Sequence, residues 1–179
     1  MPPSPALTIS GPPGSGTTTI AKLLRDELGL RYVYAGQIFR KKAEKMGMDL
    51  VDFGDYVGEH PEIDIELDQD MKEEILGGEV IVEGRVSGWL ADHHSIPAFK
   101  VFLAASKAVR AQRVANREGK SMDVILSENR EREEGERERY LDVYDFDVED
   151  TGFYDLVIDT DDKTPAEIVK IILEQRGNG

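Results

Sequence analysis

The stretch Gly11-Pro12-Pro13-Gly14-Ser15-Gly16-Thr17-Thr18-Thr19 decides how this chain is organised. It follows an apolar run at residues 6–10 that predicts a buried strand, and it precedes residues 20–28, whose apolar side chains recur at helical spacing. A glycine-rich turn between a strand and a helix is typical of a phosphate-binding loop, because its backbone N–H groups and the helix N-terminus face an anion. We therefore predict that residues 11–19 bind the phosphates of a nucleotide.

One position departs from the usual pattern of such a loop. Gly11 and Gly16 keep the spacing G-x-x-x-x-G, and Thr18 stands where a hydroxyl would ligate Mg²⁺, but Thr17 occupies the position of the lysine that normally reaches the β- and γ-phosphates. The alternative interpretation is a glycine-rich turn that only packs. The flanking strand and helix, together with arginines farther along the chain, favour a phosphate site whose positive charge comes from elsewhere.

Length and composition are those of one globular domain. The chain has 179 residues, of which 40% are hydrophobic, and its 36 acidic and 22 basic residues give a net charge of −14. This charge argues against a protein that binds nucleic acid or anionic membranes by general attraction. Cysteine is absent, which excludes disulfides and thiolate metal sites. No apolar run approaches the roughly 20 residues of a membrane span and no signal-peptide pattern is apparent, so we expect a cytoplasmic protein. We also expect a monomer.

Strands and helices are predicted to alternate along the chain. Apolar runs predict strands at residues 6–10, 31–34, 80–83, 99–103 and 155–159. Helical spacing predicts helices at residues 20–28, 35–46, 48–57, 62–76, 104–117, 122–144 and 164–175, with a helix or turn at 86–90. In the predicted helix at 48–57, one face carries Leu50, Phe53 and Val57. This order implies an α/β fold with a five-stranded parallel sheet and helices on both faces, whose ligands bind beyond the carboxyl ends of the strands.

Charged residues gather at those strand ends. Arg40 lies in a helix that opens behind Gly36, and Arg85 directly follows the strand that ends in Glu83. Arg40 and Arg85 could hold one phosphate from two sides, because a guanidinium donates paired hydrogen bonds. Glu83 could orient a metal-bound water or a donor. Each residue alone would be an ordinary surface charge, but their gathering at one rim predicts a phosphoryl-transfer site.

The segment 128–139 carries so many charges that a solvated, salt-bridged helix is its default interpretation. Arg132, Glu136 and Arg139 nevertheless fall on one helical face, where two arginines could grip a phosphate while the carboxylate accepts a hydrogen bond from a base. A helix with few apolar anchors can open and close as a lid does.

A second pair of arginines, Arg113 and Arg117, is spaced four residues apart and could face the other nucleotide. These two residues are our candidates for the cation that replaces the missing lysine, and Lys22 is the second choice.

Together these segments resemble the cytidylate kinases, specifically the archaeal branch of the nucleoside monophosphate kinases, over residues 7–173. Archaeal members commonly carry threonines where other P-loop kinases carry lysine, so Thr17 fits this branch. The resemblance rests on residues 11–19, 35–40, 61–64, 83–85 and 113–119, and on Arg132, Glu136 and Arg139.

The resemblance implies transfer of a phosphoryl group from ATP to CMP or dCMP with Mg²⁺, a monophosphate-binding insert near residues 36–76 and a lid near 118–142. It implies that no side chain acts as the nucleophile, because the phosphate of the acceptor attacks. By similarity, the turn at 160–163 would pass near the adenine, and Asp64 is a candidate for contact with the cytosine amino group. The remaining implied contacts of CMP come from Arg40, Arg85 and Arg139, which would bind its phosphate, and from Arg132 and Glu136, which match a bacterial pattern that has Asp in place of Glu.

Two alternatives remain. The first is a kinase of the same fold that acts on AMP or UMP, since few residues of the pattern address the base. The second is a nucleotide-binding switch or assembly factor that lost efficient catalysis with its lysine. An intact lid and acceptor site argue against the switch, because a switch has no use for a second nucleotide pocket.

Overall fold

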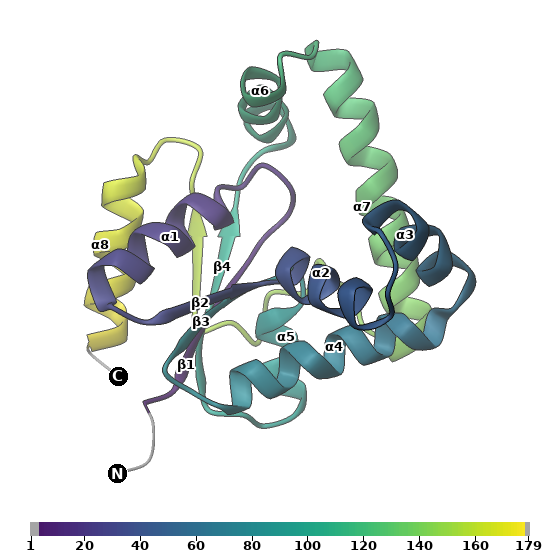
Figure 1. Ribbon diagram of the computed structural model, residues 1–179. Helices are drawn as coiled ribbons and strands as arrows, with labels where there is room; N and C mark the ends of the chain where they lie inside the picture. The colour runs from purple at the N-terminus through teal and green to yellow at the C-terminus, as the bar shows by residue number, and fades with distance from the viewer. Residues whose placement is uncertain (1–3, 178–179) are drawn as a thin grey trace.

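The computed structural model describes residues 4–177, which form a parallel five-stranded sheet covered by helices on both faces (Figure 1). The strand order is β2-β3-β1-β4-β5, and all neighbouring pairs are parallel. The five predicted strands are confirmed to within one residue at each end, and the strands are β1 (Ala6–Ser10), β2 (Arg31–Tyr34), β3 (Val80–Glu83), β4 (Ala98–Ala104) and β5 (Leu156–Asp159).

The central strands are apolar throughout because both faces of the sheet are covered. All five residues of β1 are buried, as expected for the middle strand of a parallel sheet. On one face the sheet packs against α1 (Thr17–Leu28) and α8 (Pro165–Gly177) through side chains such as Ile20 and Ile172. On the other face it packs against α5 (Ser87–His93), whose Trp89 is buried beside Phe146.

Three helices are inserted between β2 and β3: α2 (Ala35–Lys45), α3 (Leu50–Glu59) and α4 (Pro61–Leu76). They enclose a small core of their own around Phe53, which is fully buried. The Asp49 side chain caps α3, so this helix begins at Leu50 and not at residue 48. The predicted apolar face of α3 is wrong in one respect, since Leu50 lies in the exposed first turn and leaves Phe53 as the anchor.

The helices α6 (Lys107–Glu118) and α7 (Met122–Tyr144) form a hairpin that rises above the sheet (Figure 1). The predicted start of α6 at residue 104 is wrong, because β4 continues to that point and the Ser106 side chain caps the helix. Only Ile125 and Tyr140 are buried along α7. The long helix is therefore anchored near its two ends and carries a charged middle, as the sequence predicted. Across residues 4–177 the helices include no segment with the length and apolar character of a membrane span.

Candidate active site

The phosphate-loop candidate connects β1 to α1 and faces the end of β3. Ile9 and Glu83 are paired in register, so the end of β3 lies beside the loop. The hydroxyls of Thr17 and Thr18 both donate to Oε1 of Glu83, at 2.8 and 2.6 Å. The phenol of Tyr32 donates to the other oxygen, Oε2. Thr17, which replaces the expected lysine, thus contacts Glu83, the carboxylate that we predicted to orient a metal-bound water or a donor.

Two arginines of α6 hold the backbone of the loop. Arg110 donates to the Pro13 carbonyl at 3.1 Å, and Arg113 donates to the Gly14 carbonyl at 3.4 Å. Gly14 has φ +83, and an added Cβ would lie 2.7 Å from the carbonyl oxygen of Arg110. Arg113 also donates to the hydroxyl and carbonyl of Thr160, at 3.0 and 2.8 Å. These contacts fix the loop against α6 and the turn after β5.

A cavity of about 280 Å³ opens over the loop, and we call it the phosphate cavity. Five charged residues that were predicted at the site line this cavity, and they carry both signs: two are the acids Glu83 and Glu136, and three are arginines, Arg85, Arg117 and Arg132. Arg117 has a side chain that is 70% exposed and pairs with Glu118. The full lining is Ile9, Gly11, Pro12, Pro13, Gly14, Thr17, Thr18, Tyr34, Ala35, Gly36, Glu83, Gly84, Arg85, Arg117, Arg132 and Glu136.

A second cavity, of about 300 Å³, lies between α2, α4 and α7, and we call it the insert cavity. Its wall combines apolar side chains with charges, which suits a ligand that has both a flat ring and a phosphate. The apolar part includes Phe39, Leu67, Met71 and Val86. The polar part contains the predicted residues Asp64, Arg85, Arg132, Glu136 and Arg139, together with Asp68, which was not predicted.

Arg85 lines both the phosphate cavity and the insert cavity, and two of its buried nitrogen atoms make no hydrogen bond within the described residues. Its Nε is 3.4 Å from Oε2 of Glu136, but neither Nε nor Nη1 makes a hydrogen bond within the described residues, and both are buried. Arg132 pairs with the other oxygen of Glu136 at 3.1 Å. Buried donors without partners are unfavourable, so an anionic ligand beside Arg85 would relieve this cost.

The other two arginines predicted at the CMP phosphate are placed differently. Arg139 reaches the insert cavity, where its Nη1 lies 2.5 Å from Oδ1 of Asp64. Asp64 is therefore already engaged by an arginine at the wall of this cavity. Arg40 is exposed, donates to the Tyr34 hydroxyl at 2.7 Å, and lines neither the phosphate cavity nor the insert cavity.

A third cavity, of about 380 Å³, lies on the α8 side of the loop, and we call it the outer cavity. It is bounded by Arg113, Val114 and Arg117 of α6 and by Lys163 of the turn after β5. Arg117 thus borders both the outer cavity and the phosphate cavity. Lys22 is exposed on α1 and lines none of the three cavities.

The sequence matches a family model described as the cytidylate kinase-like family over residues 6–162. The chain therefore belongs to the cytidylate kinase-like family. The cytidylate kinase of Archaeoglobus fulgidus is 44% identical over 169 residues, which cover 94% of this chain and 92% of that protein. The cytidylate kinase of Methanocaldococcus jannaschii is also 44% identical, over 155 residues that cover 86% of this chain and 87% of that protein.

Solved structures with lower sequence identity share the fold of this cytidylate kinase-like chain. The shikimate kinase of Bacteroides thetaiotaomicron superposes with a TM-score of 0.62 at 17% identity, covering 97% of this chain and 98% of that one. An uncharacterized protein from Eubacterium ventriosum superposes with a TM-score of 0.74 at 16% identity, covering 98% of this chain and 100% of that one. These likenesses establish a P-loop kinase fold, as predicted.

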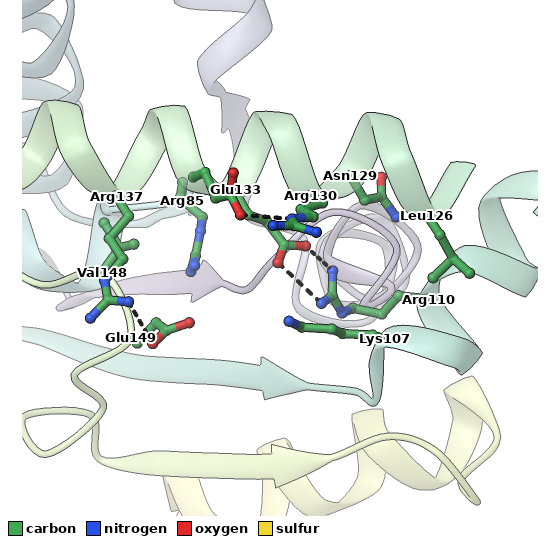
Figure 2. A pocket seen from close by; sticks show the side chains of 11 residues that line it. Arg85, Lys107, Arg110, Leu126, Asn129, Arg130, Glu133, Arg137, Val148 and Glu149 are labelled. Atoms are coloured by element: carbon green, nitrogen blue, oxygen red, sulfur yellow. Dashed lines mark hydrogen bonds and ion pairs between the residues drawn. The ribbon is translucent and has the colours of Figure 1, made fainter. Parts of the chain in front are cut away.

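Sequence reasoning missed Arg110 of this cytidylate kinase-like protein. Its buried guanidinium forms an ion pair with Glu133 of α7 (Figure 2). Because it also donates to the Pro13 carbonyl, this one side chain connects the loop, α6 and the long helix. The pair borders a further cavity of about 460 Å³ between α6 and α7. No sequence signal distinguishes Arg110 from Arg113 and Arg117 on the same helix, because its partner Glu133 lies on α7, which follows later in the chain.

Asp68 was missed for a similar reason. It is a carboxyl group on α4 that is only 8% exposed, and burial raises its pKa to about 6. The hydrogen bond from Tyr144 and the charge of Arg139 lower this pKa, and the charge of Asp64 raises it, but burial dominates. In the sequence Asp68 is one of many acidic residues on a helix, and nothing in the local pattern marks it as buried.

Proposed function

We propose that this protein transfers the γ-phosphoryl group of ATP to CMP or dCMP, giving ADP and CDP or dCDP. The observation that carries this proposal is the arrangement of the cavities. The phosphate cavity shares Arg117 with the outer cavity and shares Arg85, Arg132 and Glu136 with the insert cavity. A donor in the outer cavity and an acceptor in the insert cavity would meet over the loop. Family membership supports a cytidylate as the acceptor.

On this proposal the donor occupies the loop and the outer cavity. The N–H groups of residues 11–19 bind the phosphates, and the adenine lies toward the turn at 160–163, near Lys163. Arg117 supplies the cation that the loop lacks, because it borders the donor and transfer sites and pairs only with its neighbour Glu118 within the described residues. Arg113 instead positions the loop, since its donors are engaged by Gly14 and Thr160.

The acceptor occupies the insert cavity with its phosphate toward Arg85, Arg132 and Arg139. Helices α2–α4 form the monophosphate-binding insert and α7 forms the lid. An oxygen of the acceptor phosphate attacks the γ-phosphorus of ATP, and the bond from that phosphorus to the β,γ-bridging oxygen breaks as ADP leaves. The arginines compensate the charge around the transferring group and align the two nucleotides, so that no side chain needs to act as a nucleophile.

One residue of the first turn of α1 and one at the end of β3 fit Mg²⁺ as the cofactor. Thr18 and Glu83 offer hard oxygen ligands 2.6 Å apart beside the loop. Among residues 4–177 there is no group of three or more potential metal-ligating His, Cys, Asp or Glu side chains. A two-residue set suits Mg²⁺, which is usually bound by one or two protein groups, water and substrate phosphates. When bound, Mg²⁺ neutralises phosphate charge. We also propose that the enzyme acts as a monomer in the cytoplasm, where ATP and CMP are found.

The test is ADP formation from Mg-ATP with CMP, dCMP, UMP and AMP measured side by side. We expect strong turnover with CMP and dCMP and little with UMP or AMP. A preference for AMP or UMP would keep the fold and the transfer geometry but overturn the acceptor. No turnover with any of the four would favour a nucleotide-binding switch, in which Thr17 marks a real loss of catalysis.

A further inference from the structure

Asp68 is a buried carboxyl group at the wall of the insert cavity that the proposed transfer chemistry does not use. Its Oδ2 accepts a hydrogen bond from the Tyr144 phenol at 2.9 Å, and this is the one hydrogen bond of its side chain within the described residues. The acceptor capacity of Oδ1 therefore remains available to a ligand in the cavity. A buried acceptor of this kind favours a ligand that presents an N–H group.

The surroundings of Asp68 separate it from the phosphate end of the cavity. From α7, Arg139 and Tyr140 face it together with Tyr144, and from its own helix Asp64 faces it. Arg139 is paired with Asp64 at 2.5 Å, so its positive charge is shared and Asp68 has no ion pair of its own among residues 4–177. Apolar side chains beside Asp68 offer a surface for a flat ring: Phe39, Leu67 and Met71.

We propose that Asp68 is a specificity-determining residue that selects cytosine over uracil through the substituent at position 4 of the pyrimidine. The ionised carboxylate accepts a hydrogen bond from the N4 amino group of cytosine. Uracil carries the O4 oxygen at that place, whose lone pairs face those of the carboxylate. This inference rests on the proposed function and refines it.

Asp68 suits this role better than Asp64, the residue that the sequence suggested. Oδ1 of Asp64 is engaged by Arg139, and a ligand would have to compete with that ion pair. Asp68 is also more deeply buried, and a polar group in a desolvated site discriminates more strongly against a ligand that leaves it unpaired.

A dependence on pH follows from the chemistry of the carboxyl group. Once protonated, Asp68 carries an O–H that donates to the O4 of uracil, so discrimination is lost in acid. With the pKa of Asp68 raised to about 6, the ratio of kcat/KM for CMP to kcat/KM for UMP should rise with pH through this value and level off above it. The acceptor phosphate titrates in the same range, but it does so equally in CMP and UMP and cancels in the ratio.

The experiment measures this ratio between pH 5 and pH 8 for the intact protein and three variants. For the unmodified protein we expect the ratio to increase by about 10-fold or more across the range. Asp68→Asn places a donor and an acceptor at the same point without a titrating group, so its ratio should be near one at every pH. Tyr144→Phe removes the donor that favours the ionised form, and its midpoint should move to higher pH with the plateau kept.

Asp70→Asn is the matched control, because Asp70 lies on the same helix with a 40% exposed side chain near Lys42 and lines neither the phosphate cavity nor the insert cavity. Its ratio should follow that of the unmodified protein. A ratio that is flat with pH in the unmodified protein, or an Asp68→Asn variant that keeps full discrimination, would overturn the role of Asp68 and leave the kinase intact. No phosphorylation of CMP at any pH would instead overturn the proposed function and this inference with it. Thermal melting of each variant shows whether it is folded.

Discussion

Replacement of Arg110 by Met should destabilise the protein strongly, since this buried side chain connects three elements. The guanidinium donates to the carbonyls of Ala105 and Pro13, both at 3.1 Å, and pairs with Glu133. Two lost hydrogen bonds account for about 2 kcal/mol. Breaking a fully buried ion pair lowers the free energy of unfolding by about 3–5 kcal/mol. The Glu133 side chain is 21% exposed and partly solvated, so we assign about 1–2 kcal/mol to the loss of its pair with Arg110. The expected loss is about 3–4 kcal/mol.

Urea unfolding followed by circular dichroism measures this loss from the midpoint and slope. The matched control is Arg130→Met on α7, whose 77% exposed side chain pairs with Glu134 and should contribute less than about 1 kcal/mol. A double-mutant cycle with Glu133→Gln isolates the pair and should give a coupling of about 1–2 kcal/mol. A loss below about 1 kcal/mol for Arg110→Met, equal to that of the control, would refute the view that Arg110 anchors the long helix to the loop.

Three further predictions concern catalysis, stability and the loop. Arg117→Ala should lower kcat by about 100-fold or more with little change in KM for CMP, whereas the control Arg130→Ala should change neither kcat nor KM. Equal kinetics for the two variants would exclude Arg117 as the cation that replaces the loop lysine. The pKa of Asp68 is higher in the folded protein than in the unfolded chain, so ionisation of Asp68 destabilises the fold as pH rises through about 4 to 6. At pH 7, Asp68→Asn should therefore be more stable than the unmodified protein by up to about 3 kcal/mol. This difference should vanish below about pH 4 in urea titrations, and a constant difference would contradict the assignment. Gly14→Ala should abolish ATP binding in a calorimetric titration, because the added Cβ would lie 2.7 Å from a backbone oxygen at φ +83, while Gly54→Ala in open space should bind normally.

The framework of the fold was predictable because local sequence carries it. Apolar runs predicted the strands, and Gly29 and Gly119 end their helices with positive φ values as turn glycines do. The parallel order of the sheet then brings the ends of β1 and β3 together, so the meeting of Glu83 with the loop followed from topology alone.

The contacts that depend on α7 were not predictable. Arg110 and Asp68 are buried, and each contacts a side chain of this helix: Glu133 pairs with Arg110, and Tyr144 donates to Asp68. Neither contact can be read from the local sequence. For Arg40 the sequence suggested a site contact, with a phosphate, whereas the structure shows its guanidinium donating to the hydroxyl of Tyr34. A sequence pattern fixes which turn of a helix a residue occupies, whereas long-range packing decides what that residue contacts.

We propose that the loop of this protein, although it lacks the lysine, still supports phosphoryl transfer to a cytidylate. The most direct test follows the label from γ-³²P-ATP in the presence of Mg²⁺ and CMP, with products separated by chromatography. We expect the label in CDP, at the β-phosphate, in an amount equal to the ADP formed. Label that appears only in inorganic phosphate, or that remains in ATP, would contradict the account and favour a nucleotide-binding switch.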